Sequence, residues 1–188
     1  MRSIRLARAC LCALLSTGLA RGDLVSGKQE GKGRSLAGSR PNLVLIIADD
    51  VSATDIHCYG NSDVRTPNLD QLASQGPMWS RAYLTATVCS PTRCSIITGR
   101  YPHNTGAPEL HTALPENQPM FPRALRKAGY WTAQAGKWHL GNYPREAFDK
   151  VVDDRDRNGD SGCEYWIPLL RERPKEKPFF LWLASHDA

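Results

Sequence analysis

The feature of the sequence that most constrains the fold is a continuous apolar run that ends in two carboxylates. Residues 42–48 read NLVLIIA, follow Pro41, and are followed directly by Asp49 and Asp50. A run without polar alternation is typical of a strand buried on both faces, as in a parallel sheet covered by helices. The run therefore favours an α/β fold.

Two further apolar runs also end in side chains that can carry out chemistry. WTAQA at 131–135 precedes Lys137 and His139, and FFLWLA at 179–184 precedes His186. In open α/β sheets, sites form beyond the carboxyl ends of the strands. The runs therefore predict one shared active edge, where the strands end.

The segments between these runs carry helix signals. Thr66 and Pro67 open one segment as N-cap and first helical residue, and Ser90 and Pro91 repeat the pattern. We expect helices over 67–75, 91–98, 121–128 and, interrupted at Pro168, 163–173. The expected strands are 42–48, 78–86, 130–135 and 179–184.

Asp49 and Asp50 are the candidate metal ligands. Two carboxylates at the end of a buried strand repel one another and lose solvation, so they need a cation. Their hard oxygen atoms suit Ca²⁺ or Mg²⁺. A solvated Asp-Asp turn is the alternative, which the position at a strand end makes less favourable.

Cys89 is the candidate nucleophile. It lies just ahead of the helix expected from Pro91, where free backbone amides favour an anion, and Arg93 can reach back over the same turn. The spacing of Cys89 and Cys94 equally permits a disulfide or a buried pair. A zinc site is weaker, because the spacing is not CxxC and no second Cys/His pair lies at a suitable distance.

Lys137 and His139 alternate in the segment GKWHLG, so an extended backbone would place them on one face. A cation and an imidazole on one face can bind an anionic group and transfer a proton. A surface lysine and a structural histidine are the alternative. His57, His103 and His111 lie in loop sequences without a clear partner, and we interpret them as structural.

Residues 154–165 open like an EF-hand loop. The twelfth position, which should be a bidentate Glu, is Tyr165, and Glu164 stands one place early. No suitable helix pair is expected on either side. A solvated acidic turn is therefore preferred over a second calcium site.

The first twenty residues have the pattern of an export signal. Three arginines precede a short apolar stretch at 9–19, which ends in small residues. The stretch is too short to span a bilayer, and no other segment approaches the ~20 apolar residues of a transmembrane helix. We expect a signal peptide over 1–20, a flexible linker over 21–40 and one domain over 41–188. The destination would be the periplasm, the extracellular space or the secretory pathway.

Export to an oxidising compartment bears on the cysteines. Four lie beyond the expected leader, and this even count permits two disulfides: Cys58, Cys89, Cys94 and Cys163. If Cys89 is used for chemistry, at least one of the others is unpaired within the chain.

The charge distribution argues against nucleic acid as a partner. Residues 1–40 hold eight Lys/Arg and two acids, net +6, whereas residues 41–188 hold sixteen and seventeen, net −1. The basic character therefore belongs to the leader, and the expected domain is close to neutral.

Several blocks of the sequence, in order, resemble the type I sulfatase family. Cys89-Ser-Pro-Thr-Arg93 resembles the first signature of that family, CxPxR, and AGKWHLG at 135–141 resembles the second. PNLVLIIADD resembles its metal-binding first strand, TPNLDQLASQG its first helix, and PFFLWLASHDA a later strand. The resemblance implies an alkaline-phosphatase-like α/β fold, with a mixed, mostly parallel sheet flanked by helices.

The resemblance also implies a sulfuric ester hydrolase. In this family a separate maturation enzyme, which reads CxPxR, oxidises the cysteine to formylglycine (3-oxoalanine), whose hydrate attacks the sulfur of a sulfate ester. Carried over by position, Cys89 would be the nucleophile precursor, and Asp49, Asp50 and modified Cys89 would bind Ca²⁺. Arg93 would steady the hydrate, Lys137 would hold the sulfate, and His139 would assist proton movement.

GAPELH and FFLWLASHDA are similar to members that act on sulfated sugars, including heparan N-sulfatase-like proteins, so we expect a sulfated small molecule or glycan as substrate.

Family members run to several hundred residues, and their second pair of metal ligands would lie beyond Ala188. We therefore expect the N-terminal part of such a protein, truncated at its C-terminus.

A disulfide between Cys89 and Cys94 would compete with the oxidation of Cys89 to formylglycine. The alternatives are a phosphoester or phosphonate hydrolase of the same superfamily, and a truncated, non-catalytic secreted protein that keeps only anion or glycan binding.

Overall fold

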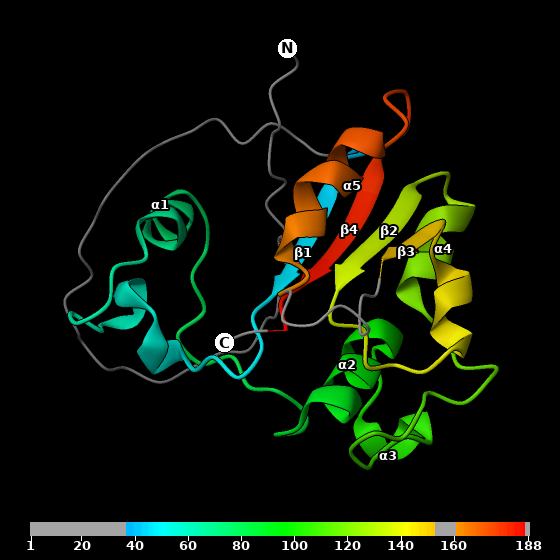
Figure 1. Ribbon diagram of the computed structural model, residues 1–188, viewed down its shortest axis with the longest axis horizontal. Helices are drawn as coiled ribbons and strands as arrows, with labels where there is room; N and C mark the ends of the chain where they lie inside the picture. Colours follow the sequence, from blue (N-terminus) through cyan, green and yellow to red (C-terminus); the bar gives the residue numbers. More distant parts are fainter. Residues whose placement is uncertain (1–36, 153–160, 187–188) are drawn as a thin grey trace.

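A computed structural model describes residues 37–152 and 161–186 of the chain (Figure 1). The expected signal peptide and most of the expected linker lie outside the described residues. So do the acidic residues that open the EF-hand-like stretch.

The described strands form one sheet in which every pairing is parallel. The strands are β1 (Leu43–Ile47), β2 (Trp131–Gly136), β3 (Lys150–Val152) and β4 (Phe179–Ala184), in the spatial order β1-β4-β2-β3. β4 is therefore a central strand: Leu43 pairs with Phe180 on one side, and Trp131 pairs with Phe179 on the other. The parallel sheet expected from the apolar runs is confirmed. The expectation that the run at 42–48 is buried on both faces is wrong, because β1 lies at an edge of the described sheet and Val44 and Ile46 are exposed.

The helices lie between the strands in sequence. They are α1 (Pro67–Gln75), α2 (Cys89–Thr98), α3 (Pro102–Thr105), α4 (Phe121–Lys127) and α5 (Trp166–Glu172). Short 3-10 helices cover Ala53–Asp55, His57–Tyr59, Tyr143–Ala147 and Cys163–Tyr165. Within the described residues, no helix is long and apolar enough to cross a membrane.

The central strand β4 is covered on both faces. Its successive side chains point to opposite sides of the sheet, and those on each side join a buried cluster. Phe180 and Trp182 join one buried cluster with Cys94 and Ile97 of α2. Phe179, Leu181 and Leu183 join a second cluster with Leu169 of α5. The result is a three-layer arrangement in which α5 lies on one face and α2 and α4 lie on the other (Figure 1).

The prediction of a strand over 78–86 is wrong. No strand forms there, and Trp79, Tyr83 and Leu84 are exposed. The segment contains apolar residues, but no neighbouring strand pairs with it and no layer covers it. β3, which is only three residues long, was not expected, because a run of that length gives little periodic signal.

The start of α2 and the effect of Pro168 on α5 also differ from expectation. α2 begins at Cys89 with Val88 as its N-cap, two residues before the expected start. Pro168 does not interrupt α5, because it is the third residue of the helix, where its missing N–H would have had no partner in the helix.

Arg40, assigned to the flexible linker, contacts the folded part. Its guanidinium donates a hydrogen bond to the carbonyl of Ala128 and lies 5.5 Å from the centre of the Tyr130 ring. The folded region therefore includes at least this residue of the expected linker.

Candidate functional site

Three of the candidate residues meet where the strands end. Asp49 lies two residues after β1, Lys137 directly follows β2, and Arg93 belongs to α2. The Lys137 ammonium forms an ion pair with Oδ2 of Asp49, and Nη2 of Arg93 lies 3.4 Å from Oδ1 of the same carboxylate. Nη1 of Arg93 donates a 2.8 Å hydrogen bond to the carbonyl of Lys137. Side chains distant in sequence thus form one charged cluster.

Arg93 is the buried centre of this cluster. Its side chain is only 2% exposed. Burial lowers the pKa of Arg93 below its usual value, while the charge of Asp49, the hydrogen bond to Asp49 and the charge of Cys89 act in the opposite direction. An arginine taken out of water in this way needs an anion beside it, and Asp49 supplies that anion.

The segment from Cys89 to Arg93 forms the first turn and a half of α2. Cys89 is half-buried, Ser90 is fully buried, and the Thr92 hydroxyl donates a 2.7 Å hydrogen bond to the carbonyl of Ala86. Cys89 therefore sits at the helix N-terminus itself, where backbone N–H groups are not used by the helix. This position is compatible with an anionic group beside the side chain.

The two disulfides that the cysteine count permits are not present among the described residues. Cys58, Cys89, Cys94 and Cys163 are all free. Cys89 and Cys94 lie five residues apart in one helix, a rise of about 7.5 Å, which exceeds the usual Cα separation in a disulfide. Burial raises the pKa of the Cys94 thiol to about 11, so Cys94 stays protonated near neutral pH.

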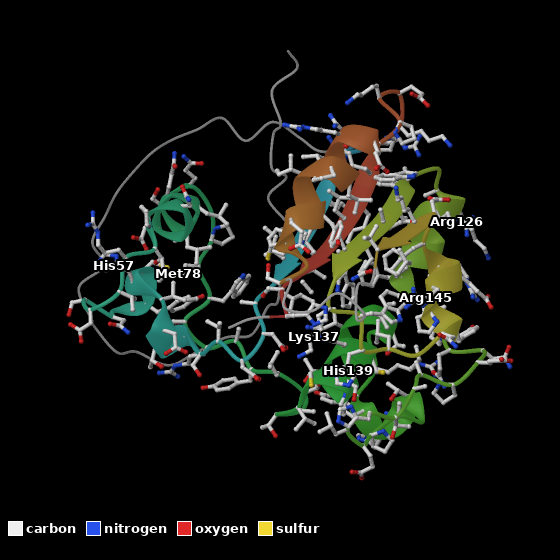
Figure 2. All side chains as sticks on the ribbon, viewed as in Figure 1. His57, Met78, Arg126, Lys137, His139 and Arg145 are labelled. Atoms are coloured by element: carbon white, nitrogen blue, oxygen red, sulfur yellow. The ribbon has the colours of Figure 1, made fainter. Side chains whose placement is uncertain are left out.

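His139 does not lie on an extended segment. β2 ends at Gly136, and His139 has a positive φ of 56°. Its Nε2 lies 2.7 Å from Nδ1 of His111. In Figure 2, Lys137 and His139 both lie below the ends of the strands and beside α2. The alternation argument for a shared face therefore does not apply, although the two residues remain neighbours.

The contact between His111 and His139 was missed by the sequence reasoning, which interpreted His111 as structural. His57 pairs with Asp70 at 2.9 Å within the α1 region, far from Lys137 in Figure 2, and His103 stacks on Tyr101. His111 ends the segment GAPELH, which is similar to sulfatase family members that act on sulfated sugars, but nothing in that segment points to His139, 28 residues away.

Asp50 and Asp49 differ in environment. Asp49 is 8% exposed and forms ion pairs with Arg93 and Lys137, whereas Asp50 is exposed and has a positive φ of 53°. Their oxygen atoms are suitable donors for Ca²⁺. Among the described residues, however, no group of three or more His, Cys, Asp or Glu side chains is placed to hold a metal ion. The two aspartates fit such an ion in chemistry but supply only part of a site.

Gly136 allows the two central strands to end close together. A Cβ at this position would overlap the carbonyl oxygen of Ala184, and the residue has a positive φ of 87°. The next amide, of Lys137, donates a 3.0 Å hydrogen bond to the same carbonyl. The backbone that carries Lys137 is therefore fixed to the end of β4.

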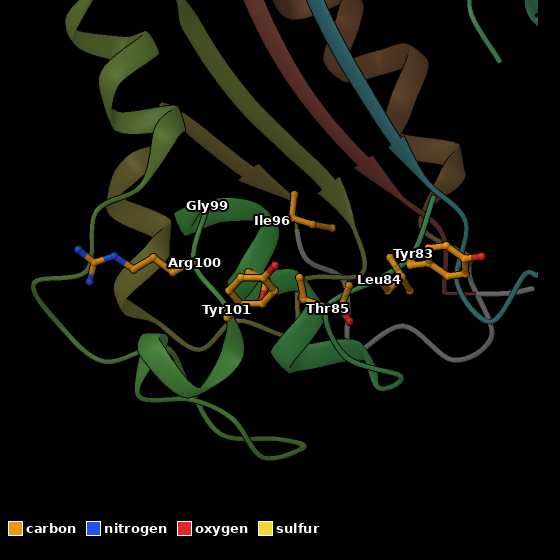
Figure 3. A pocket seen from close by; sticks show the side chains of 9 residues that line it. Tyr83, Leu84, Thr85, Ile96, Gly99, Arg100 and Tyr101 are labelled. Carbon is orange, nitrogen blue, oxygen red and sulfur yellow. The ribbon is translucent and has the colours of Figure 1, made fainter. Parts of the chain in front are cut away.

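A pocket of about 380 Å³ lies along one side of α2 (Figure 3). The segment 83–85, the helix residues Thr92, Ser95 and Ile96, and Tyr101 line it. Except for Thr92, which lies within the CSPTR segment, the lining contains none of the candidate residues. The pocket is therefore separate from the cluster of Asp49, Arg93 and Lys137.

Comparisons with known proteins agree with the motifs. The model of the sulfatase family matches residues 41–187. Arylsulfatase H of Homo sapiens is 43% identical over an alignment of 115 positions, which covers 55% of this chain and 20% of that protein. N-acetylglucosamine-6-O-sulfatase of Bacteroides thetaiotaomicron is 33% identical over an alignment of 163 positions, which covers 74% of this chain and 29% of that protein.

Solved structures give the same result. A structure of a protein in complex with its substrate D-glucosamine-2-N,6-O-disulfate matches with a TM-score of 0.70 and 29% identity, over 78% of this chain and 34% of that one. The chain thus spans about a fifth to a third of the length of these relatives.

Proposed function

Because the chain belongs to the sulfatase family, we propose that it forms the N-terminal part of the catalytic domain of a sulfuric ester hydrolase. The observation that carries the proposal is the charged cluster of Asp49, Arg93 and Lys137. It brings together the end of β1 and the two segments that resemble the sulfatase signatures.

Lys137 and Arg93 of the cluster, and His139 from the same segment as Lys137, each have a physical part in this proposal. The Lys137 ammonium binds an oxygen of the sulfate group, since a cation stabilises a dispersed negative charge. Arg93 fixes the backbone carbonyl of Lys137 and the Asp49 carboxylate, and so keeps the ammonium in place. The imidazole of His139 carries a proton between the reacting groups.

Cys89 is the proposed site of modification to formylglycine by a maturation enzyme. Once formed, the hydrated aldehyde supplies the hydroxyl that attacks sulfur. Cys89 is half-buried and free, which leaves its thiol open to oxidation. Cys94 is an unsuitable substitute, because it is fully buried and its pKa is raised to about 11.

Asp49 and Asp50 are the proposed calcium ligands, together with modified Cys89. Calcium supplies positive charge that polarises sulfate oxygens. Two carboxylates provide only part of the roughly six to eight oxygen ligands that Ca²⁺ takes. The proposal therefore requires further oxygen ligands in addition to these two carboxylates.

The proposed substrate is a sulfated sugar. One relative is an N-acetylglucosamine-6-O-sulfatase, and one similar structure contains a doubly sulfated glucosamine as substrate. We also propose that residues 1–20 direct export, as their sequence pattern indicates.

The test is to express the chain with and without a formylglycine-generating enzyme. Mass spectrometry of the peptide that contains Cys89 reports modification, and release of sulfate from p-nitrophenyl sulfate and glucosamine 6-sulfate reports activity. We expect conversion of Cys89 and calcium-dependent sulfate release that EDTA abolishes. Lys137→Met should lower kcat/KM about 100-fold, whereas Lys127→Met, at the exposed end of α4, should leave it unchanged.

The outcomes separate the alternatives. A Cys89 thiol that stays unmodified beside the maturation enzyme contradicts the formylglycine mechanism. Hydrolysis of p-nitrophenyl phosphate by the unmodified chain would favour a phosphoester hydrolase. Conversion of Cys89 without sulfate release would favour a non-catalytic chain.

A further inference from the structure

We propose that His111 is a positioning residue for His139: its Nδ1 hydrogen-bonds to Nε2 of His139 and holds that imidazole in one orientation and one tautomer. The inference rests on the proposed function for its link to catalysis, but the contact itself is a property of the fold. His111 lies outside CSPTR and GKWHLG, the two segments that resemble the sulfatase signatures.

The first observation is the contact between the two rings. The ring nitrogens lie 2.7 Å apart and the ring centroids 4.8 Å apart. At this distance one nitrogen donates a proton and the other accepts it. Nε2 of His139 is therefore directed at His111, while Nδ1 of His139 is buried. The contact thus sets the orientation of the His139 ring.

The second observation is that the loop of His111 is hydrogen-bonded to the start of α2, beside Cys89. The backbone amide of His111 donates a 2.8 Å hydrogen bond to the hydroxyl of Ser90, which is fully buried and adjacent to Cys89. The side chain of His111 reaches His139, and its backbone reaches the segment of Cys89. His111 thus links the two segments that resemble the sulfatase signatures.

The third observation is that the two loops are fixed to each other independently of the histidines. The amide of Leu114 donates a 3.0 Å hydrogen bond to the carbonyl of Leu140, and both side chains are buried. Gly141 has a positive φ of 84°, and a Cβ there would lie 2.5 Å from Cβ of Ala113. The position of the His111 ring is therefore set by the packing of two loops, not by the imidazole pair alone.

The fourth observation concerns the backbone. His111 and His139 have positive φ values of 66° and 56°, a conformation that non-glycine residues adopt at a cost. Two such residues facing one another indicate that the fold holds the rings in place at the expense of backbone strain. Strain of this kind gathers at functional sites.

The direct test uses the 188-residue chain with ¹⁵N-labelled histidine. We expect a scalar coupling across the hydrogen bond between Nδ1 of His111 and Nε2 of His139, and ¹⁵N shifts of His139 that correspond to one tautomer. His111→Ala should convert these shifts to those of averaged tautomers. His111→Asn, whose amide can occupy the place of Nδ1, should restore them, and His103→Ala is the matched control that should change nothing.

The same variants test the link to catalysis. Where sulfate release is measurable, His111→Ala should lower kcat about 10- to 100-fold with little change in KM, the scale expected when one reacting group loses its orientation. His111→Asn should recover most of that loss.

The results separate this inference from the proposed function. Absence of the coupling in the wild-type chain, or His139 shifts that are identical in His111→Ala and the wild type, would overturn the inference even if sulfate is released. Equal loss of kcat in His111→Asn and His111→Ala would reduce His111 to a loop-packing residue. If no variant releases sulfate, the proposed function fails, and the ¹⁵N shifts still decide whether His111 orders His139.

Discussion

At the scale of single residues, Arg93 combines burial with two partners from different parts of the chain. It contacts the carboxylate of Asp49 and the carbonyl of Lys137. Replacing it by methionine removes the buried cation, so that Asp49 keeps only Lys137. We expect Arg93→Met to lower the free energy of unfolding by about 3 kcal/mol, as measured by urea denaturation.

Arg126→Met is the matched control for this change. Arg126 pairs with Asp149 at 2.8 Å, but its side chain is 48% exposed. Exposed pairs contribute about 0–1 kcal/mol because water solvates both charges. Equal losses for the two variants would mean that burial of Arg93 adds nothing to the strength of its contacts.

Cys94 gives a prediction about pH. Its pKa is raised from 9.0 to about 11 in the folded chain because the thiol is buried. The unfolded chain therefore releases the Cys94 proton at lower pH than the folded chain does. The stabilising effect is complete below pH 9 and is lost as the pH rises towards 11.

The measurement compares the wild type with Cys94→Ala by urea denaturation between pH 8 and pH 11. The free energy of unfolding of the wild type should fall by up to about 3 kcal/mol relative to the variant over this interval. Parallel curves for the two proteins would show that the thiol of Cys94 titrates normally.

At the scale of elements, the apolar runs predicted three of the four described strands, but not the burial of each one. β4 is buried on both faces, whereas β1 lies at an edge of the described sheet and exposes Val44 and Ile46. The runs that became β1, β2 and β4 needed no information from the rest of the chain. The segment 78–86 is similarly apolar in part, yet it forms no strand, because a strand also needs a partner for its backbone groups. Pairing is a tertiary property that a local pattern does not contain.

The same distinction applies to the site. Asp49, Arg93 and Lys137 were expected at one edge from their positions after strands and at a helix start, and they contact one another. His111 was interpreted as structural, because its relation to His139 depends on how two loops dock. Residues that follow regular elements can be placed from sequence, whereas residues in loops depend on packing between distant segments.

Gly136 gives a prediction for the end of β2. Gly136→Ala would place a methyl group on the carbonyl of Ala184, where the strands β2 and β4 end. We expect the free energy of unfolding to fall by about 3 kcal/mol or more, from the strained φ and the forced separation of the strands. Thermal denaturation monitored by circular dichroism measures the loss.

Gly99→Ala is the control. Gly99 also has a positive φ, of 67°, at the end of α2, but a Cβ there meets nothing within 4 Å. Its replacement should cost only about 1 kcal/mol. If both variants lose the same free energy of unfolding, the positive φ alone explains the loss, and the close approach to Ala184 contributes nothing.

At the scale of the whole molecule, β1 forms one edge of the described sheet. Ile46 is 60% exposed and Val44 is 37% exposed, on the face where α5 covers the neighbouring strands. An apolar edge strand is a template for association between chains. We expect the 188-residue chain to associate as its concentration rises, and Ile46→Lys to shift it towards monomer in sedimentation velocity experiments.

Ile167→Lys is the matched control for association. Ile167 is 55% exposed, but it lies on α5 rather than on a strand edge. Its replacement should leave the association unchanged. An equal effect of both lysines would point to general hydrophobicity of the surface instead of strand pairing.

The strand order also has a consequence for the way the chain is made on the ribosome. β1 emerges among the first described residues, and its partner, β4, emerges as the last described strand. Until β4 has been synthesised, the apolar residues of β1 therefore lack their partner strand, and contacts so far apart in sequence form slowly. Whatever keeps the nascent chain from aggregating has to protect β1 for as long as it takes to synthesise the residues between β1 and β4.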